Sequence, residues 1–194
     1  MNCVPMIAFM TTPFRLEHLN HCAPDAFCAA LADIWEHAPW VSQGVVDQRP
    51  FASTDALHAA MVGVVAALDE PERVAFYAGH PELAGEDARR GTMTDASIAE
   101  QGTLALAQLG ADDAQRWNTL NQSYRARFGF PFILCIRRHT RDSALQAFEQ
   151  RLRHNRATEL AVALDEISAI TRLRLDRFMT DVSPVASQGA PIPC

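Results

Sequence analysis

The residues of this chain that could do chemistry begin with a histidine placed where a helix must stop. In "YAGHPELAG", Tyr77 to Gly85, the pair His80-Pro81 stands between two glycines, and helical patterns flank the stretch. Proline lacks a backbone N–H and disfavours helical backbone in the residue before it, so the helix must end near His80. Histidine titrates near neutral pH and suits general acid–base catalysis. A histidine at a helix break can equally be idle, and these nine residues do not decide between the two.

A second polar group lies in "DASIAEQ". Ser97, Glu100 and Gln101 stand at positions i, i+3 and i+4, so on a helix they share one face. Such a trio is usually a solvent-exposed face. The apolar neighbours Ile98 and Leu104 instead favour a partly buried helix, and a buried carboxylate needs a partner.

Two further features could receive an anion. In "RARFGFPFILC", Gly129 permits a tight turn, while Pro131 keeps Phe130 extended, so the following backbone N–H groups can point at an anion. A buried turn without a ligand is the alternative interpretation of this stretch. Arg174 lies on the apolar side of the last helical pattern, and arginines are rarely buried without a carboxylate or an anionic ligand. Arg172 reads as a surface charge.

Metal chemistry is the weaker interpretation. "EHLNHCAPD" gathers His18, His21 and Cys22, and a helix would make His18 and Cys22 neighbours on a possible metal-binding face. The nearby Pro24 and the missing fourth ligand argue against such a site, so we expect no metal. We interpret "WEHAPW" as a helix end whose two tryptophans cap the core.

Composition excludes several classes of function. All 17 basic residues are arginine, which removes Schiff-base, pyridoxal-phosphate and P-loop lysines. The net charge of −6 argues against nucleic-acid or membrane partners, which require a basic face. The five cysteines have no CxxC spacing, which favours a reducing cytoplasm over a disulfide framework. The candidate groups together suit acid–base chemistry on a small anionic substrate.

The elements that must position these groups are helices. Capping residues and apolar periodicity predict helices over 23–38, from Ser53 towards Pro71, over 94–110, over 112–129, over 141–155 and over 157–179. Only 130–136 resembles a strand, and one strand makes no sheet, so we expect an extended buried segment or a helix start there. The sequence thus predicts a single compact all-α domain of seven or eight helices over 15–180. Residues 1–14 are expected to form an extension and 181–194 a disordered, proline-rich tail.

The order of these motifs resembles one enzyme family. "GHPELAG", "SIAEQ", "LNQSYRARFGFPFILCIR" and "ALDEISAITRLRL" follow one another as in the 2-oxo-4-hydroxy-4-carboxy-5-ureidoimidazoline (OHCU) decarboxylase family, and "WEHAPWV" and "RPF" (Arg49–Phe51) fit its N-terminal half. The resemblance covers roughly residues 16–178. It implies a cofactor-free, all-α, usually homodimeric enzyme of urate catabolism, which removes a carboxylate as CO2 to give (S)-allantoin.

The resemblance also implies a role for each motif. His80 and Glu100 match catalytic residues, and Pro81, Ser97 and Gln101 match substrate-binding positions. The segment Phe130, Pro131, Phe132 and Ile133 matches the one whose backbone contacts the substrate ring, and Arg174 matches the arginine that holds an anion. Two rival functions are a non-catalytic helical interaction module and a metal-dependent hydrolase built on the His18 cluster.

Overall fold

The described part of the chain is helical throughout. The computed structural model describes residues 12–83 and 110–180, and in these ranges it contains eight α-helices, two 3₁₀ turns and no β-strand. The all-α prediction is confirmed. None of the described helices is long and apolar enough to cross a membrane. The elements are α1 (Thr12–His21), α2 (Pro24–Ala30), α3 (Pro39–Gln43), η1 (Val46–Gln48), α4 (Thr54–Ala66), α5 (Glu70–Ala78), α8 (Ala111–Phe128), η4 (Ile136–Arg138), α9 (Arg141–Arg151) and α10 (Arg156–Thr180).

Capping chemistry sets several of the helix boundaries. The Ser53 hydroxyl accepts the backbone N–H of Ala56 at 3.1 Å and begins α4. Asp69 and Glu72 form a reciprocal capping box at the start of α5. Gly129 ends α8 in the left-handed conformation, with φ of 80°, which a residue with a Cβ adopts only with strain. The expected helix over 94–110, the segment 1–11 and the tail 181–194 lie outside the described residues.

One predicted helix is wrong. The stretch 23–38 does not form a single helix, because α2 ends at Ala30 and turns follow as far as His37. Ile34, Trp35 and Glu36 are three consecutive buried residues. Neighbouring residues on a helix point about 100° apart, so one helix face cannot bury all three, whereas a series of turns can. Burial of this stretch therefore overrides its helical periodicity.

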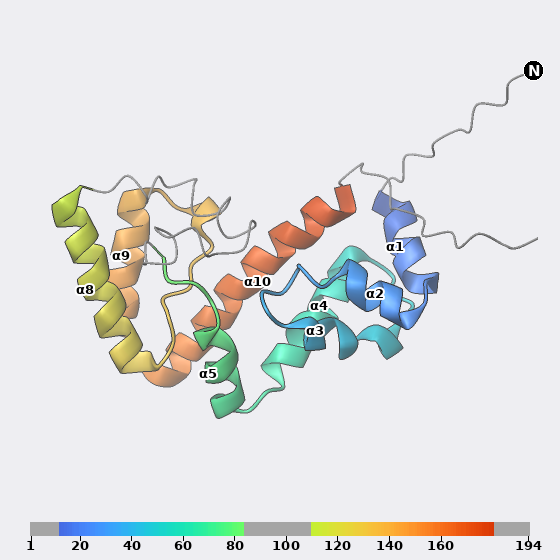
Figure 1. Ribbon diagram of the computed structural model, residues 1–194, viewed down its shortest axis with the longest axis horizontal. Coiled ribbons are helices and arrows are strands. Elements are labelled where there is room, and N and C mark those ends of the chain that lie inside the picture. Colours follow the sequence, from blue (N-terminus) through green and yellow to red (C-terminus); the bar gives the residue numbers. More distant parts are fainter. Residues whose placement is uncertain (1–11, 84–109, 181–194) are drawn as a thin grey trace, which may run out of the picture.

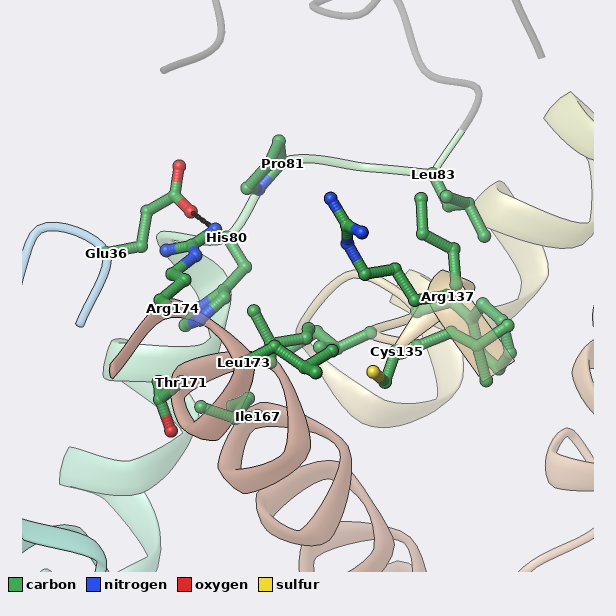
Figure 2. A pocket seen from close by; sticks show the side chains of 15 residues that line it. Glu36, His80, Pro81, Leu83, Cys135, Arg137, Ile167, Thr171, Leu173 and Arg174 are labelled. Atoms are coloured by element: carbon green, nitrogen blue, oxygen red, sulfur yellow. Dashed lines mark hydrogen bonds and ion pairs between the residues drawn. The ribbon is translucent and has the colours of Figure 1, made fainter. Parts of the chain in front are cut away.

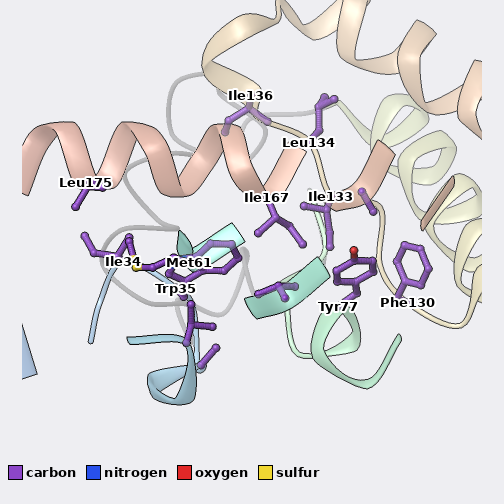
Figure 3. Packing of buried hydrophobic residues seen from close by; sticks show 14 of the residues in the cluster. Ile34, Trp35, Met61, Tyr77, Phe130, Ile133, Leu134, Ile136, Ile167 and Leu175 are labelled. Atoms are coloured by element: carbon purple, nitrogen blue, oxygen red, sulfur yellow. The ribbon is translucent and has the colours of Figure 1, made fainter. Parts of the chain in front are cut away.

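The long helix α10 organises the molecule. It runs diagonally across Figure 1, with α1 and α4 packed against it and α8 lying beside α9 near its N-terminal end. The core is continuous along α10, from Leu175 beside Ile34 and Trp35 to Ile167 beside Tyr77 (Figure 3). The segment 130–136 crosses this core without regular structure up to η4, and all seven of its residues are buried. The expected extended buried segment is thus confirmed.

Candidate active site

His80 lies just beyond the end of α5. The helix ends at Ala78, and the backbone N–H of His80 still donates to the Tyr77 carbonyl at 3.1 Å before Pro81 turns the chain away. The T-shaped contact between the His80 and Phe76 rings, with centroids 5.1 Å apart, fixes the imidazole on one side. Pro81 therefore ends the helical backbone, and the His80 imidazole lies at the junction between α5 and the following loop.

That loop is attached to α8. The side-chain amide of Asn121 donates to the Leu83 carbonyl at 2.9 Å, and Arg125 pairs with Glu82 at 2.8 Å. Asn121 is buried, so its hydrogen bond is shielded from water and holds the loop more firmly than the exposed ion pair does. The chain is therefore fixed on both sides of His80, by α5 before it and by these contacts with α8 after it.

A cavity of about 650 Å³, which includes its open mouth, lies beside His80. The lining is mostly apolar with a few polar groups, as is typical of small-ligand sites. Its walls come from the His80 loop, the segment after Phe130, the turn before α3, and α10 (Figure 2). The lining residues are Glu36, His80, Pro81, Leu83, Phe132, Ile133, Leu134, Cys135, Ile136, Arg137, Ile167, Ile170, Thr171, Leu173 and Arg174.

Helical periodicity explains why Arg174 reaches the cavity and Arg172 does not. At about 100° per residue, Arg174 lies seven residues after Ile167 and returns to within about 20° of it, while Arg172 is rotated by about 140°. Ile167 and Arg174 both line the cavity. Arg172 instead pairs with Asp55 and with Asp176 away from it.

The guanidinium of Arg174 is held by a carboxylate. Its Nη2 donates to Oε2 of Glu36 at 2.9 Å, and the two side chains are only 9% and 4% exposed (Figure 2). A charge-assisted bond in such a shielded place is stronger than an exposed ion pair. Glu36 thereby fixes the position of Arg174 in the cavity wall.

Glu36 is a site residue that the sequence interpretation missed. We read "WEHAPW" as a structural helix end, and Trp35 is indeed buried in the core. The next residues form turns, with His37 at a φ of 53°, in the left-handed region that non-glycine residues rarely occupy. This irregular backbone lets Trp35 enter the core while Glu36 enters the cavity. The positive φ could not be read from the letters.

Burial keeps His80 neutral. It lowers the pKa of the imidazole from 6.5 to about 4, and it outweighs Glu36 and the nearby Phe76 carbonyl, which both favour the charged ring. Arg174 and His37 add to the lowering. The Nδ1 atom is buried and has no hydrogen-bond partner among the residues that the structure describes. A polar atom left in this state is costly, and a ligand in the cavity could relieve that cost.

The extended wall of the cavity is anchored from behind by a buried ionic network. Arg151 donates through Nη1 to the Ile133 carbonyl at 2.7 Å and pairs with Glu159, whose Oε1 lies 2.5 Å from Nη2. The same carboxylate accepts from the hydroxyl of Tyr124 and contacts His154 Nδ1 at 2.7 Å. Arg151 and Glu159 are almost fully buried. The network fixes the backbone orientation at Ile133.

A second carboxylate fixes the same wall nearer the turn η4. The backbone N–H of Cys135 donates to Oε2 of Glu166 at 2.7 Å. Phe132 stacks on Phe148 with ring centroids 3.8 Å apart, and the Arg151 guanidinium lies 4.6 Å from the centroid of the Phe132 ring. The segment therefore lacks regular structure but is held at several points.

The structure brings together some of the residues that the sequence singles out. His80, Pro81, Phe132, Ile133 and Arg174 line the cavity. Phe130 and Pro131 are buried but are not among the lining residues. Ser97, Glu100 and Gln101 lie outside the described residues. The lining residues that the sequence did not single out include Glu36, Arg137 and Thr171.

Two residues of the weaker metal interpretation, His21 and Cys22, make other contacts in the structure. His21 Nδ1 lies 2.8 Å from the Glu17 carbonyl, and the Cys22 thiol donates to the Leu19 carbonyl at 3.5 Å. Within residues 12–83 and 110–180, no three His, Cys, Asp or Glu side chains are grouped so that they could hold a metal ion.

Comparison with known proteins gives consistent matches. The family model for OHCU decarboxylase matches residues 20–176. The 2-oxo-4-hydroxy-4-carboxy-5-ureidoimidazoline decarboxylase of Haloferax volcanii is 38% identical over 167 residues, which cover 86% of this chain and 97% of that protein.

Two solved structures share the fold. An (S)-allantoin synthase superposes with a TM-score of 0.67 at 25% identity and covers 84% of this chain, which spans 53% of that longer one. An OHCU decarboxylase crystallised in the presence of (S)-allantoin superposes with a TM-score of 0.58 at 20% identity, covering 78% of this chain and 99% of that one.

Proposed function

The chain belongs to the OHCU decarboxylase family, and on this basis we propose that it converts 2-oxo-4-hydroxy-4-carboxy-5-ureidoimidazoline into (S)-allantoin and CO2 in urate breakdown. The observation that carries the proposal is the neutral His80, whose buried Nδ1 lacks a partner among the described residues, beside the Glu36–Arg174 pair in the cavity wall. An unpaired ring nitrogen next to a fixed cation suits a substrate that offers both a hydroxyl proton and an anionic group.

The substrate supplies its own electron sink. The carbon that loses CO2 carries a hydroxyl and adjoins a ring C=N bond. When the bond to the carboxylate breaks, its electron pair forms a C=C bond, and the former C=N pair moves to nitrogen, which takes a proton. The hydroxyl then gives up its proton as the carbonyl forms, and a proton adds to one face of the neighbouring carbon. The protein must orient the ring and manage these protons.

We assign the removal of the hydroxyl proton to His80. A pKa near 4 leaves the imidazole neutral at physiological pH, so it accepts the hydroxyl proton. Arg174, fixed by Glu36, supplies N–H donors where negative charge develops on the ring. The backbone of the segment Phe130 to Ile133, beside Pro81, would hold the ring.

The remaining polar contacts are proposed from the family resemblance. Glu100 would hold the substrate hydroxyl or tune the imidazole, while Ser97 and Gln101 would bind the ureido or ring amides. All three lie outside the described residues. We further propose that residues 15–180 form the catalytic unit, that it works as a homodimer, and that it acts in the cytoplasm. Cys22, Cys28 and Cys135 form no disulfide, which supports a reducing compartment.

The test is the reaction itself. Incubation with freshly generated OHCU, followed by circular dichroism, separates enzymatic (S)-allantoin from the racemic product of the spontaneous reaction. We expect wild-type protein to accelerate the decay and to give one sign of dichroism. His80→Ala should lose about 10²–10⁴ in rate while keeping its far-ultraviolet spectrum. Racemic product from wild-type protein, or a loss below about tenfold in the variant, would contradict the assignment.

A further inference from the structure

A second arginine stands at the rim of the same cavity. Arg137 lies in η4, immediately after the extended wall, and its side chain is solvent-exposed while lining the cavity. In Figure 2 its guanidinium reaches toward Pro81 and Leu83, on the side away from Glu36 and Arg174. It makes no hydrogen bond or ion pair with any of the described residues. This cation is available to a ligand.

The charges of the described lining residues leave Arg137 uncompensated. Arg174 is matched by the carboxylate of Glu36, at 2.9 Å. His80 is mostly neutral above about pH 5, because burial lowers its pKa to about 4. The charge that remains on this part of the wall is the single positive charge of Arg137. A ligand carrying one negative charge would complement it.

We propose that Arg137 binds the departing carboxylate of the substrate and so distinguishes the carboxylated substrate from the neutral product. This rests on the proposed function. A guanidinium matches a carboxylate with two parallel hydrogen bonds. Allantoin has no carboxylate, so the same residue would not retain the product.

The rim is the appropriate place for this contact. Decarboxylation turns a charged carboxylate into neutral CO2, so a cation that holds it strongly in a dry interior would stabilise the substrate more than the transition state. A solvent-exposed arginine captures the same group more weakly. The partly buried Arg174 then stabilises the charge that develops on the ring. The backbone near Arg137 is also held in place, because the Glu166 carboxylate anchors the N–H of Cys135, two residues earlier.

The experiment compares Arg137→Gln with Arg138→Gln. The two substitutions remove the same charge from adjacent residues of one 3₁₀ turn, and both residues are exposed, but only Arg137 lines the cavity. We measure KM and kcat for freshly generated OHCU and the inhibition constant of (S)-allantoin. R137Q should lower kcat/KM by about three- to twentyfold, mostly through KM, while inhibition by allantoin stays within twofold of wild type. R138Q should match wild type in all three quantities.

Three other outcomes would each contradict a specific part of the proposal. Equal losses in R137Q and R138Q would show that only the general charge of the surface matters. A matching loss of affinity for allantoin would show that Arg137 contacts the part common to substrate and product. Either result overturns the assignment while wild-type activity stands. Wild-type protein that does not process OHCU would instead overturn the proposed function.

Discussion

The protonation state of His80 is the most direct test of the site's electrostatics. Burial lowers its pKa from 6.5 to about 4. At about pH 5.5, a group with a pKa of 4 is about 97% neutral, whereas one with a pKa of 6.5 is about 9% neutral. The buried and unperturbed alternatives therefore differ about tenfold in the population of neutral imidazole, at a pH where the protein can be assayed.

Kinetics should show this difference. We expect kcat/KM for OHCU to be level from about pH 8 down to about pH 5.5 and to fall only towards pH 4, because this ratio reports the pKa of essential groups in the free enzyme. Stopped-flow circular dichroism, corrected for the spontaneous reaction, gives the profile. NMR titration of ¹³C-histidine protein, with the His80 signal assigned by its loss in His80→Asn, gives the pKa without turnover.

The same shift predicts a pH dependence of stability. The folded pKa lies below the unfolded one, so the unfolded chain binds the extra proton first. The contribution of neutral His80 to the free energy of unfolding is therefore fully present above about pH 6.5, and it is lost as the pH falls towards 4. Between about pH 7.5 and pH 4.5 this group should account for about 2–3 kcal/mol of the free energy of unfolding. Urea unfolding should show a smaller loss by that amount in His80→Asn than in wild type.

An acid limb in kcat/KM near pH 6.5, with an NMR pKa at the same value, would refute the argument that burial controls this imidazole. Equal pH dependence of unfolding in wild type and His80→Asn would do the same. Other titrating groups, such as His58, whose pKa burial also lowers, are common to both proteins and cancel in the comparison.

Two further predictions concern the carboxylates that hold the site together. Glu36→Gln removes the counter-charge of Arg174 while keeping the side-chain volume; we expect kcat to fall about tenfold, with a smaller change in KM, because a loosened guanidinium meets the developing charge less well. Glu159→Gln leaves the Arg151 guanidinium buried without its counter-ion, and urea unfolding should show a loss of about 3–5 kcal/mol.

Each has a matched control in the chain. Asp33 lies in the same turns as Glu36 but is exposed and does not line the cavity, so Asp33→Asn should leave kcat unchanged. Glu149 pairs with Arg116 at the surface, so Glu149→Gln should cost less than about 1 kcal/mol. A kcat loss shared by the Asp33 and Glu36 variants, or equal losses of stability at Glu149 and Glu159, would contradict the reasoning.

The sequence predicts helices best where a local capping residue marks the beginning or the end of the helix. Ser53 begins α4 through its own side chain, and Gly129 ends α8 because glycine tolerates a positive φ. Both depend on contacts within a few residues. The stretch 23–38 has no comparable signal, and there the burial of Ile34 and Trp35 against distant parts of the chain decides the structure. That decision is not encoded in the local periodicity.

The same distinction applies to the site. His80 and Arg174 can be singled out from sequence, since a proline marks one and an apolar helix face marks the other. Glu36 belongs to a stretch that reads as a helix end, and its partner is 138 residues away. Arg137 looks like one of two ordinary surface arginines until η4 places it on the cavity and Arg138 off it. What the sequence does not show is therefore the irregular backbone at His37 and η4, and the contact of Glu36 with a distant segment.

The distribution of charge around the cavity gives the proposed reaction a direction. The carboxylate would begin at the exposed Arg137, and its electron pair must move to the ring as CO2 leaves. Arg174 is the less exposed of the two arginines and is held in place by Glu36. Its N–H donors therefore stabilise the charge that develops on the ring and not the carboxylate charge that is lost. A neutral His80 can accept the hydroxyl proton without first losing one. If the two arginines exchanged environments, the more shielded guanidinium would hold the departing carboxylate. That arrangement would stabilise the bound substrate more than the transition state.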